Sequence, residues 1–284
     1  MRYARRMDPT AQLQRAERFR DLHAGPRVLV MPNPWDAGSA KLLASLGFEA
    51  LATTSLGLAN MLGVSDGEGL VSRYDVLENC RAICDATSLP VSADLENCYA
   101  HSPKQAATMI TDGADAGLVG GSIEDSTGDA AKPIYDFALA VERVQAAVEA
   151  ARALPFPFTL TARAENFLHG IRDMDDTLKR LQAFEKAGAD VLYAPGLKTL
   201  DEVKTVVAAV SKPVNVVMSS LPPSTTAQDL ETLGVRRISI GGAFSRVALG
   251  AMFRAAQDLR TGSFAWNTDV MPTKDFKAIF KAPR

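Results

Sequence analysis

Short runs of apolar, mostly β-branched residues recur along this chain, separated by longer stretches with apolar residues on one side only. In the longer stretches, apolar residues return at three- and four-residue spacing, which is typical of helices with one buried face. A helix is also predicted before the first apolar run, over about residues 10–24. The short runs predict eight strands, at 27–32, 49–54, 90–94, 116–125, 158–163, 189–195, 213–218 and 236–241.

Glycines mark the joints between these elements. Four helical stretches are predicted to end at a glycine before the next strand, because glycine readily adopts the left-handed conformation that closes a helix; they are Gly47, Gly113, Gly188 and Gly234. The regular alternation predicts an α/β fold, a single (β/α)8 TIM barrel domain over 1–284 with an extra N-terminal helix and a C-terminal helical extension at 243–284. A doubly wound open sheet is the alternative, although no G-x-G-x-x-G follows the first strand.

Composition narrows the function classes. The chain of 284 residues is 47% hydrophobic and 23% charged, with a formal net charge of −2. It has no basic stripe, so we expect no nucleic-acid partner. No apolar run approaches the roughly 18 residues of a membrane span, and the N-terminus lacks a signal-peptide core, so we expect no membrane partner and a cytoplasmic location. Three cysteines, Cys80, Cys84 and Cys98, are too few for a disulfide framework and are interpreted as buried thiols.

Carboxylates follow several of the predicted strands. Functional groups of a TIM barrel gather at the C-terminal ends of the strands and in the loops that follow. Asp94 and Glu96 follow the third strand, Glu124 ends the fourth, and Asp66 lies in the loop after the second. Such a cluster indicates a hard divalent cation, Mg²⁺ or Mn²⁺, with some carboxylates bound through water. Arg163, at the end of the fifth strand, offers a planar fork for an acidic group of a substrate.

Each of these residues also has a simpler interpretation. A lone acid at a strand end is often a helix cap or a solvated loop charge, and for Asp66 or Asp125 alone that interpretation is as good as a functional one. It is less favoured for the set of Asp94, Glu96 and Glu124, because three adjacent strands end in acidic residues in the same way. Cys98 is disfavoured as a nucleophile because no histidine is placed to act as its base. His169 is interpreted as a loop histidine.

Several of these motifs together carry a family resemblance. The order is D-x-E after a P-V strand, then I-E-D, A-R-x-E and A-G-A-D, preceded by NPWDAGSAKLLASLGFEALATTS and an LG-x-x-D segment. Over about residues 25–260, this order resembles the isocitrate lyase/phosphoenolpyruvate mutase superfamily. The resemblance implies a Mg²⁺-dependent barrel that makes or breaks a C–C or P–C bond beside a 2-oxo group, through a metal-stabilised enolate.

The resemblance also assigns roles to individual positions. It implies that Asp94 binds the metal directly, that Glu96 and Glu124 hold metal-bound waters, and that Asp66 lies near those waters. It implies that the backbone of Thr54 and Ser55 binds the pyruvyl oxygens and that Arg163 binds the acidic group. The candidates for catalysis are Asp66, Arg163 and Lys132, the last of which lies in the loop after the fourth strand. Further candidates for substrate binding, from their places at strand ends, are Trp35 and Asn215.

Two segments depart from the family pattern. The lyase members carry a K-[KR]-C-G-H loop after I-E-D, whereas residues 126–137 read STGDAAKPIYDF, so a standard isocitrate or methylisocitrate lyase mechanism is not implied. The mutase-type loop is also absent, and Lys132 is the residue of this segment that could reach the site. The family's D-x-D-x-G-Y-G has become D-L-E-N-C-Y-A at 94–100.

The sequence therefore leaves several functions open. The leading prediction is a Mg²⁺-dependent lyase that cleaves a C–C bond of a small 2-oxo or 2-hydroxy carboxylic acid. The alternatives are a phosphonate enzyme, of the mutase or hydrolase type, and a catalytically silent barrel that binds a 2-oxo acid. A phosphate-binding aldolase is disfavoured because no strand ends in a Schiff-base lysine. The family habit predicts a homo-oligomer, a dimer or tetramer, in which 243–284 is exchanged between subunits.

Overall fold

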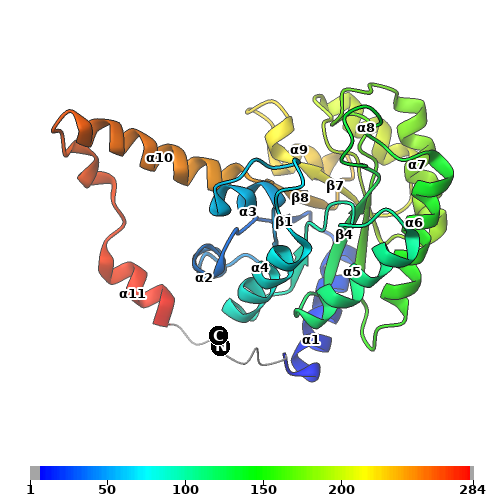
Figure 1. Cartoon of the computed structure of the whole chain (residues 1–284), viewed down its shortest axis with the longest axis horizontal. Helices are drawn as coiled ribbons and strands as arrows, with labels where there is room; N and C mark the ends of the chain where they lie inside the picture. Colours follow the sequence, from blue (N-terminus) through cyan, green and yellow to red (C-terminus); the bar gives the residue numbers. More distant parts are fainter. Residues whose placement is uncertain (1–6, 282–284) are drawn as a thin grey trace.

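The computed structural model of this protein describes residues 7–281 and contains one sheet of eight parallel strands. The strands follow the order β1-β8-β7-β6-β5-β4-β3-β2, as in a TIM barrel, so the predicted fold is confirmed (Figure 1). Each predicted apolar run contains one strand. They are β1 (Leu29–Met31), β2 (Leu51–Ala52), β3 (Val91–Ala93), β4 (Gly120–Glu124), β5 (Thr159–Arg163), β6 (Val191–Tyr193), β7 (Val214–Val217) and β8 (Arg237–Ser239).

The seam between β1 and β2 is held by bonds just beyond the ends of these two strands. The backbone N–H of Ala52 donates to the carbonyl of Pro32 at 3.1 Å. One residue further along each strand, the Asn33 side chain donates to the carbonyl of Thr53 at 2.9 Å. These two bonds bring the end of β1 beside the end of β2 and complete the ring of strands.

Helices alternate with the strands and form the outer layer of the barrel (Figure 1). Their caps follow ordinary rules, for example the capping box of Ser72 and Asp75 at the start of α4. They are α1 (Pro9–Ala24), α2 (Ala37–Ser45), α3 (Ser55–Leu62), α4 (Arg73–Ala86), α5 (Pro103–Asp115), α6 (Phe137–Arg152), α7 (Met174–Ala187), α8 (Leu200–Ala209), α9 (Ala227–Thr232), α10 (Ala243–Arg260) and α11 (Thr273–Lys281), with 3-10 turns η1 (Met218–Ser220) and η2 (Ala265–Asp269).

Three of the four predicted glycine joints adopt the left-handed conformation, namely Gly47, Gly188 and Gly234. The prediction for Gly113 is wrong, because α5 continues to Asp115 and the left-handed residue is Gly117, with φ of 101°. Gly113 is a helical residue that meets a side chain of the next strand segment. A Cβ there would lie 3.0 Å from Leu118 Cδ1, so the missing side chain allows Leu118 to pack against the helix.

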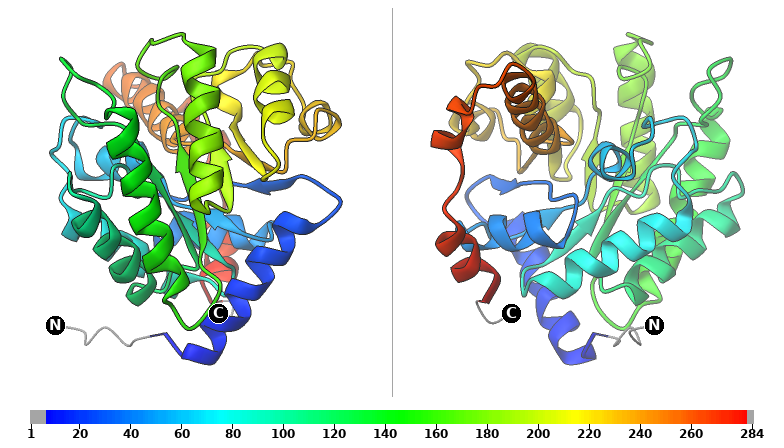
Figure 2. Two further views of the ribbon diagram at one scale, coloured as in Figure 1. Left: turned by 90° about the vertical axis from the view of Figure 1, so that its right-hand side faces the viewer. Right: turned by 60° about the vertical axis from the view of Figure 1, so that its left-hand side comes forward.

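Helix α1 closes the N-terminal end of the barrel (Figure 2). Its fully buried Phe19 packs with Leu29, Met31 and Val119 in a small apolar cluster beneath the strands. The main apolar core lies between the strands and the surrounding helices. Because α1 seals this end, the opposite end, where the strands finish, is the end left open for a ligand.

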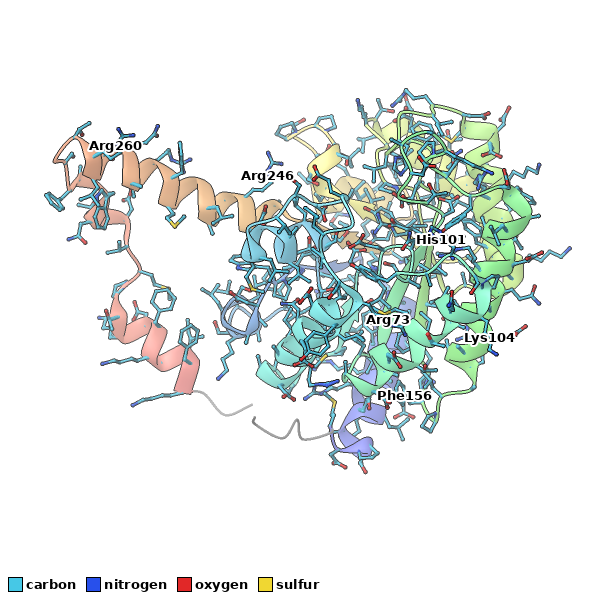
Figure 3. All side chains as sticks on the ribbon, in the orientation of Figure 1. Arg73, His101, Lys104, Phe156, Arg246 and Arg260 are labelled. Carbon is cyan, nitrogen blue, oxygen red and sulfur yellow. The ribbon has the colours of Figure 1, made fainter. Side chains whose placement is uncertain are left out.

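The C-terminal segment leaves the barrel. Helix α10 projects away from it, with Arg246 near the barrel and Arg260 at the far end (Figure 3). Several apolar side chains of α10 face solvent, among them Val247 and Phe253 at 65% and 62% exposure. Helix α11 returns to α2, where Lys41 Nζ donates to the carbonyl of Phe280 at 2.9 Å. Within residues 7–281, no helix combines the length and apolarity that crossing a membrane requires.

Candidate active site

Two adjacent cavities lie at the C-terminal ends of the strands. The inner cavity has a volume of about 240 Å³, and residues of β3, β5, β7 and β8 contribute to its wall. The outer cavity, of about 300 Å³, lies against the loops after β2, β3, β4 and β5. Ser55, Arg163 and Leu168 line both cavities. The two volumes are therefore neighbouring parts of one site.

Arg163 is the charged centre of this site. Its guanidinium lies 2.8 Å from Asp94, 3.1 Å from Glu124 and 2.8 Å from Glu165. The side chain is 11% exposed, and it lies over the ring of Tyr193. One arginine thus touches three carboxylates that come from β3, β4 and β5.

Asp94 lines the inner cavity beside Arg163. Besides Arg163, its carboxylate accepts a bond from the backbone N–H of Ser55 at 3.3 Å and one from Ser122 Oγ at 3.4 Å. Its own backbone N–H donates to Thr53 Oγ1 at 3.0 Å. The carboxylate is therefore held in place by two neighbouring strand ends as well as by the arginine.

The loop after Asp94 has an unusual backbone. Glu96, Cys98 and Tyr99 have φ values of 48°, 59° and 53°. This left-handed region costs a residue with a side chain roughly 1–2 kcal/mol, and in the family motif D-x-D-x-G-Y-G glycine occupies one of these three positions, that of Cys98. The Tyr99 hydroxyl donates to Glu96 Oε1, which fixes the carboxylate at the wall of the outer cavity.

Arg143 of α6 holds this loop from behind. Its side chain is 1% exposed and donates to the carbonyl oxygens of Ala100, His101 and Asn97 at 2.5, 2.6 and 2.5 Å. The guanidinium also stacks over the ring of Tyr135 at 4.3 Å. A buried cation that satisfies three loop carbonyls supplies the bonding that offsets the strained backbone.

The site carries more negative than positive charge. Burial, and then the charges of Asp94 and Asp66, raise the pKa of Glu96 to about 7. Burial and Asp94 likewise raise the pKa of Asp66. Burial also raises the pKa of Glu124 and of Glu165, even though Arg163 beside them acts in the opposite direction. The carboxylates of this site would be relieved either by protons or by a further cation.

The donor set suits a hydrated divalent cation. In the part of the chain that the structure describes, no three His, Cys, Asp or Glu side chains form a group that could hold a metal ion on their own. The acidic side chains are instead spread over two neighbouring cavities: Asp94 lines the inner one, and Asp66, Glu96 and Glu124 line the outer one. Mg²⁺ commonly keeps several waters and uses one or two carboxylates directly. Residues Asp94, Glu96 and Glu124 fit that arrangement through oxygen atoms and charge.

Two helix N-termini meet the inner cavity. Helix α3 starts at Ser55, and its cap Thr54 accepts a bond from the N–H of Gly57 at 3.3 Å. Helix α10 starts just after Gly241 and Gly242, which also line the cavity. The positive ends of helix dipoles favour anions, so this cavity has the electrostatics of an acid-binding site.

The structure brings most of the predicted site residues together. Those at the inner cavity are Thr54, Ser55, Asp94, Arg163 and Asn215, and those at the outer cavity are Asp66, Glu96, Glu124 and again Arg163. Trp35 and Lys132 line neither cavity. The backbone of Trp35 bonds to Ser39 and Asn79, and Lys132 pairs with Asp136 at 2.5 Å on the exposed loop.

Three residues with open roles are also placed. Asp125 is buried between Arg180, at 3.0 Å, and the backbone N–H of Glu165, so it joins neighbouring elements. Cys98 is fully buried, and burial raises the pKa of its thiol to about 12, which makes a thiolate nucleophile unfavourable. His169 lines the outer cavity, where Nε2 lies 3.1 Å from Ser126 Oγ.

Sequence reasoning missed Asn33, Tyr193 and Arg237, which all line the inner cavity. Arg237 stands beside Arg236 in the sequence, and a strand sends neighbouring side chains to opposite faces. Arg236 bonds outward to the carbonyl of Pro26, whereas Arg237 turns into the barrel. Ser239 lies two residues beyond Arg237 on the same strand and also lines the cavity, so the alternation of side chains along the strand was the signal that Arg237 faces inward.

Comparisons with known proteins agree with this geometry. A sequence model of the family described as phosphoenolpyruvate phosphomutase matches residues 19–260. An uncharacterized protein of Mycobacterium tuberculosis is 31% identical over 246 residues, which cover 86% of this chain and 89% of that protein. An oxaloacetate decarboxylase of Bradyrhizobium diazoefficiens is 28% identical over 88% of this chain and 86% of its own.

Solved structures give the same result. A candidate lyase/mutase from Burkholderia cenocepacia superposes with a TM-score of 0.93 at 52% identity, over 96% of this chain and 98% of its own. Oxaloacetate acetylhydrolase in complex with its product oxalate has a TM-score of 0.84 at 25% identity, over 93% of both chains. Phosphonopyruvate hydrolase, in complex with oxalate and Mg²⁺, shares the fold with a TM-score of 0.84 at 23% identity, over 93% of this chain and 94% of its own.

Proposed function

This chain belongs to the phosphoenolpyruvate mutase/isocitrate lyase superfamily, and from that premise we propose that it is a Mg²⁺-dependent lyase. Its substrate is a small 2-oxo or 2-hydroxy carboxylic acid, and the bond cleaved is C–C. One observation carries the proposal: an anion-binding cavity and an acid-rich cavity share Arg163. The first suits the carboxylate of such a substrate, and the second suits the cation that its 2-oxygen requires.

The metal would be held by Asp94, Glu96 and Glu124, with Mn²⁺ as a possible substitute for Mg²⁺. When bound, the ion supplies Lewis-acid stabilisation of the negative charge that develops on the 2-oxygen of the substrate. Arg163 keeps three carboxylates in place around this position.

The substrate would lie at the N-terminus of α3. The backbone N–H of Ser55 points at the cavity, where it donates to Asp94. Thr54 caps the helix and so fixes the direction of these N–H groups. Asn215 lines the opposite side of the cavity, on β7. Oriented donors that are fixed before the substrate arrives stabilise developing charge without reorganisation.

Proton transfer falls to the outer cavity. Asp66 lines it, and burial and the charge of Asp94 raise the pKa of its carboxyl group. A general acid or base works best when its pKa is near the working pH. Lys132 is not proposed for this role, because it is exposed and paired with Asp136.

The test is a substrate panel. Purified protein is incubated with C4 to C6 2-oxo and 2-hydroxy acids, with Mg²⁺ or with EDTA, and release of pyruvate, glyoxylate or oxalate is followed by chromatography. We expect Mg²⁺-dependent cleavage of at least one acid and its loss in Asp94→Ala. Asp175→Ala, on the exposed first turn of α7 and outside both cavities, is the matched control and should retain activity. Metal-independent turnover, or full activity of Asp94→Ala, would contradict the proposal.

A second candidate is a phosphonate enzyme of the mutase or hydrolase type. It is favoured by the phosphoenolpyruvate phosphomutase model, which matches residues 19–260. Release of inorganic phosphate from phosphonopyruvate in the same panel would support it over the lyase. Tight Mg²⁺-dependent binding of a 2-oxo acid without any turnover would instead support a silent binding barrel.

We also propose that the protein is a homo-oligomer, a dimer or a tetramer. The support is the apolar surface of α10, on which Val247, Met252 and Phe253 are each more than 60% exposed. Such a surface on a projecting helix is costly in water unless another surface covers it. Exchange of 243–284 between subunits would cover it, and light scattering after size-exclusion chromatography measures the resulting mass.

A further inference from the structure

Arg237 is the buried cation at the bottom of the inner cavity. It is the first residue of β8 and is 5% exposed, and its side chain lies inside the barrel. Nε donates to Asn215 Oδ1 and Nη1 donates to Thr161 Oγ1, both at 2.9 Å. Both partners are neutral. Among the described residues, no carboxylate pairs with this guanidinium, and no hydrogen bond is formed by Nη2.

The barrel interior around Arg237 is polar where TIM barrels usually place branched apolar side chains. Ser92, Ser122 and Ser239 line the same cavity and are all buried. Thr161 lies two residues below Arg163 on β5, as Ser92 lies two residues below Asp94 on β3. At about 3.3 Å per residue, the Arg237 guanidinium therefore reaches a level roughly 7 Å below the backbone of Arg163 and Asp94.

A buried charge without a partner is costly, and proteins seldom keep one for stability alone. Burial lowers the pKa of Arg237 to about 10, so the side chain still carries its charge at neutral pH. The upper arginine differs, because Arg163 is already neutralised by Asp94, Glu124 and Glu165. The unpaired positive charge of the inner cavity thus lies at its lower end.

We propose that Arg237, with Asn215 and Ser239 beside it, forms a subsite for a second acidic group of the substrate. The substrate is then a dicarboxylic 2-oxo or 2-hydroxy acid, with its reacting end near Asp94 and its distal carboxylate against Arg237. The inference rests on the proposed function and adds the substrate class to it. The cavity, at about 240 Å³, suits such a compact dianion.

A purely structural role for Arg237 makes a different prediction. Its bonds to Asn215 and Thr161 join β8, β7 and β5, and a structural arginine would be needed equally for every ligand. A subsite residue is needed only by ligands that carry the distal carboxylate. Matched pairs of acids separate the two roles because they differ in that group alone.

The experiment measures binding of two such pairs by calorimetry with saturating Mg²⁺: 2-oxoglutarate against 2-oxopentanoate, and 3,3-difluorooxaloacetate against 3,3-difluoro-2-oxobutanoate. In the unmodified protein, we expect the dicarboxylate of at least one pair to bind more tightly. Arg237→Gln should weaken that dicarboxylate by about 10- to 100-fold, as expected for a lost charged hydrogen bond. The monocarboxylate should change by less than about threefold, and Arg237→Lys should recover part of the preference.

Equal loss for both members of a pair would overturn the subsite, and so would an unmodified protein that binds the monocarboxylates as tightly as the dicarboxylates. The second result needs no variant and therefore stands even if Arg237→Gln fails to fold. The two proposals fail separately. An Arg237-dependent preference without turnover in the panel would keep the subsite and reject the lyase. Turnover with an unchanged preference would keep the lyase and reject the subsite.

Discussion

Replacing Glu96 with glutamine should change how the stability of the protein depends on pH. Burial raises the pKa of this carboxyl group from 4.5 to about 7 in the folded protein, with Asp94 and Asp66 adding to the shift. Between these two pH values, the folded protein binds more protons than the unfolded chain. The stabilisation from Glu96 is therefore fully present below about pH 4.5 and is lost as the pH rises through 7.

The size of the effect follows from the shift. The difference between 4.5 and 7 is 2.5 pH units, and each unit corresponds to about 1.36 kcal/mol. The upper bound is therefore about 3.4 kcal/mol, and partial exposure of Glu96 reduces it to roughly 1–3 kcal/mol. Glutamine has no proton to lose. The Glu96→Gln variant should match the unmodified protein near pH 4.5 and exceed its free energy of unfolding at pH 8 by this amount.

Urea unfolding, followed by tryptophan fluorescence at pH 5 and pH 8 in EDTA, measures this difference. Adding Mg²⁺ at pH 8 should stabilise the unmodified protein more than Glu96→Gln, because a nearby cation favours the charged carboxylate. Glu68→Gln, an exposed residue of the neighbouring loop, is the control and should follow the unmodified protein. Parallel pH profiles for the unmodified protein and Glu96→Gln would refute the reasoning, since the carboxylate would then be solvated.

Further predictions concern the arginines and α10. Arg163→Gln leaves three carboxylates, one buried and two partly buried, without their cation, so it should lower the free energy of urea unfolding by about 3–5 kcal/mol. It should also abolish oxalate binding measured by calorimetry, whereas Arg180→Gln should destabilise the protein without changing that affinity. Arg143→Ala removes three bonds to loop carbonyls, so it should lower the free energy of unfolding by about 3–5 kcal/mol and speed hydrogen exchange at residues 96–101; unchanged exchange would contradict the role given to this arginine. Val247→Asp should shift the mass in light scattering toward the monomer, and an unchanged mass would remove α10 from the interface.

Much of the barrel could be predicted because its signals are local. Strands buried on both faces appear as short apolar runs, and carboxylates at strand ends point to a common site once the barrel is assumed. The positions of Asp94, Glu96 and Glu124 followed from those two rules. The resemblance then added the roles of Thr54 and Ser55, whose chemistry lies in backbone N–H groups that a side-chain pattern does not reveal.

The remainder depended on contacts between distant segments. The sequence predicted Lys132 near the site because its loop follows β4. In the structure, Lys132 instead forms an ion pair with Asp136, four residues further along the chain. The three carboxylate contacts of Arg163 join β3, β4 and β5, so no single segment reveals them. Arg143 lies in an amphipathic helical stretch, where an arginine is expected at the surface. In the structure it is buried, and it donates to carbonyl groups of the loop after β3.

The loop between β4 and α6 is a small folded unit in its own right. Ser126 and Ile134 form an antiparallel bridge, and the N–H of Thr127 donates to the carbonyl of Pro133 at 2.9 Å. The Thr127 side chain also accepts a bond from the N–H of Asp129 at 2.9 Å, so residues 127–133 are shaped largely by bonds within the loop itself. We expect that this stretch can be exchanged without refolding the barrel. This offers protein engineers, as it would have offered evolution, a route to new specificities on an unchanged frame.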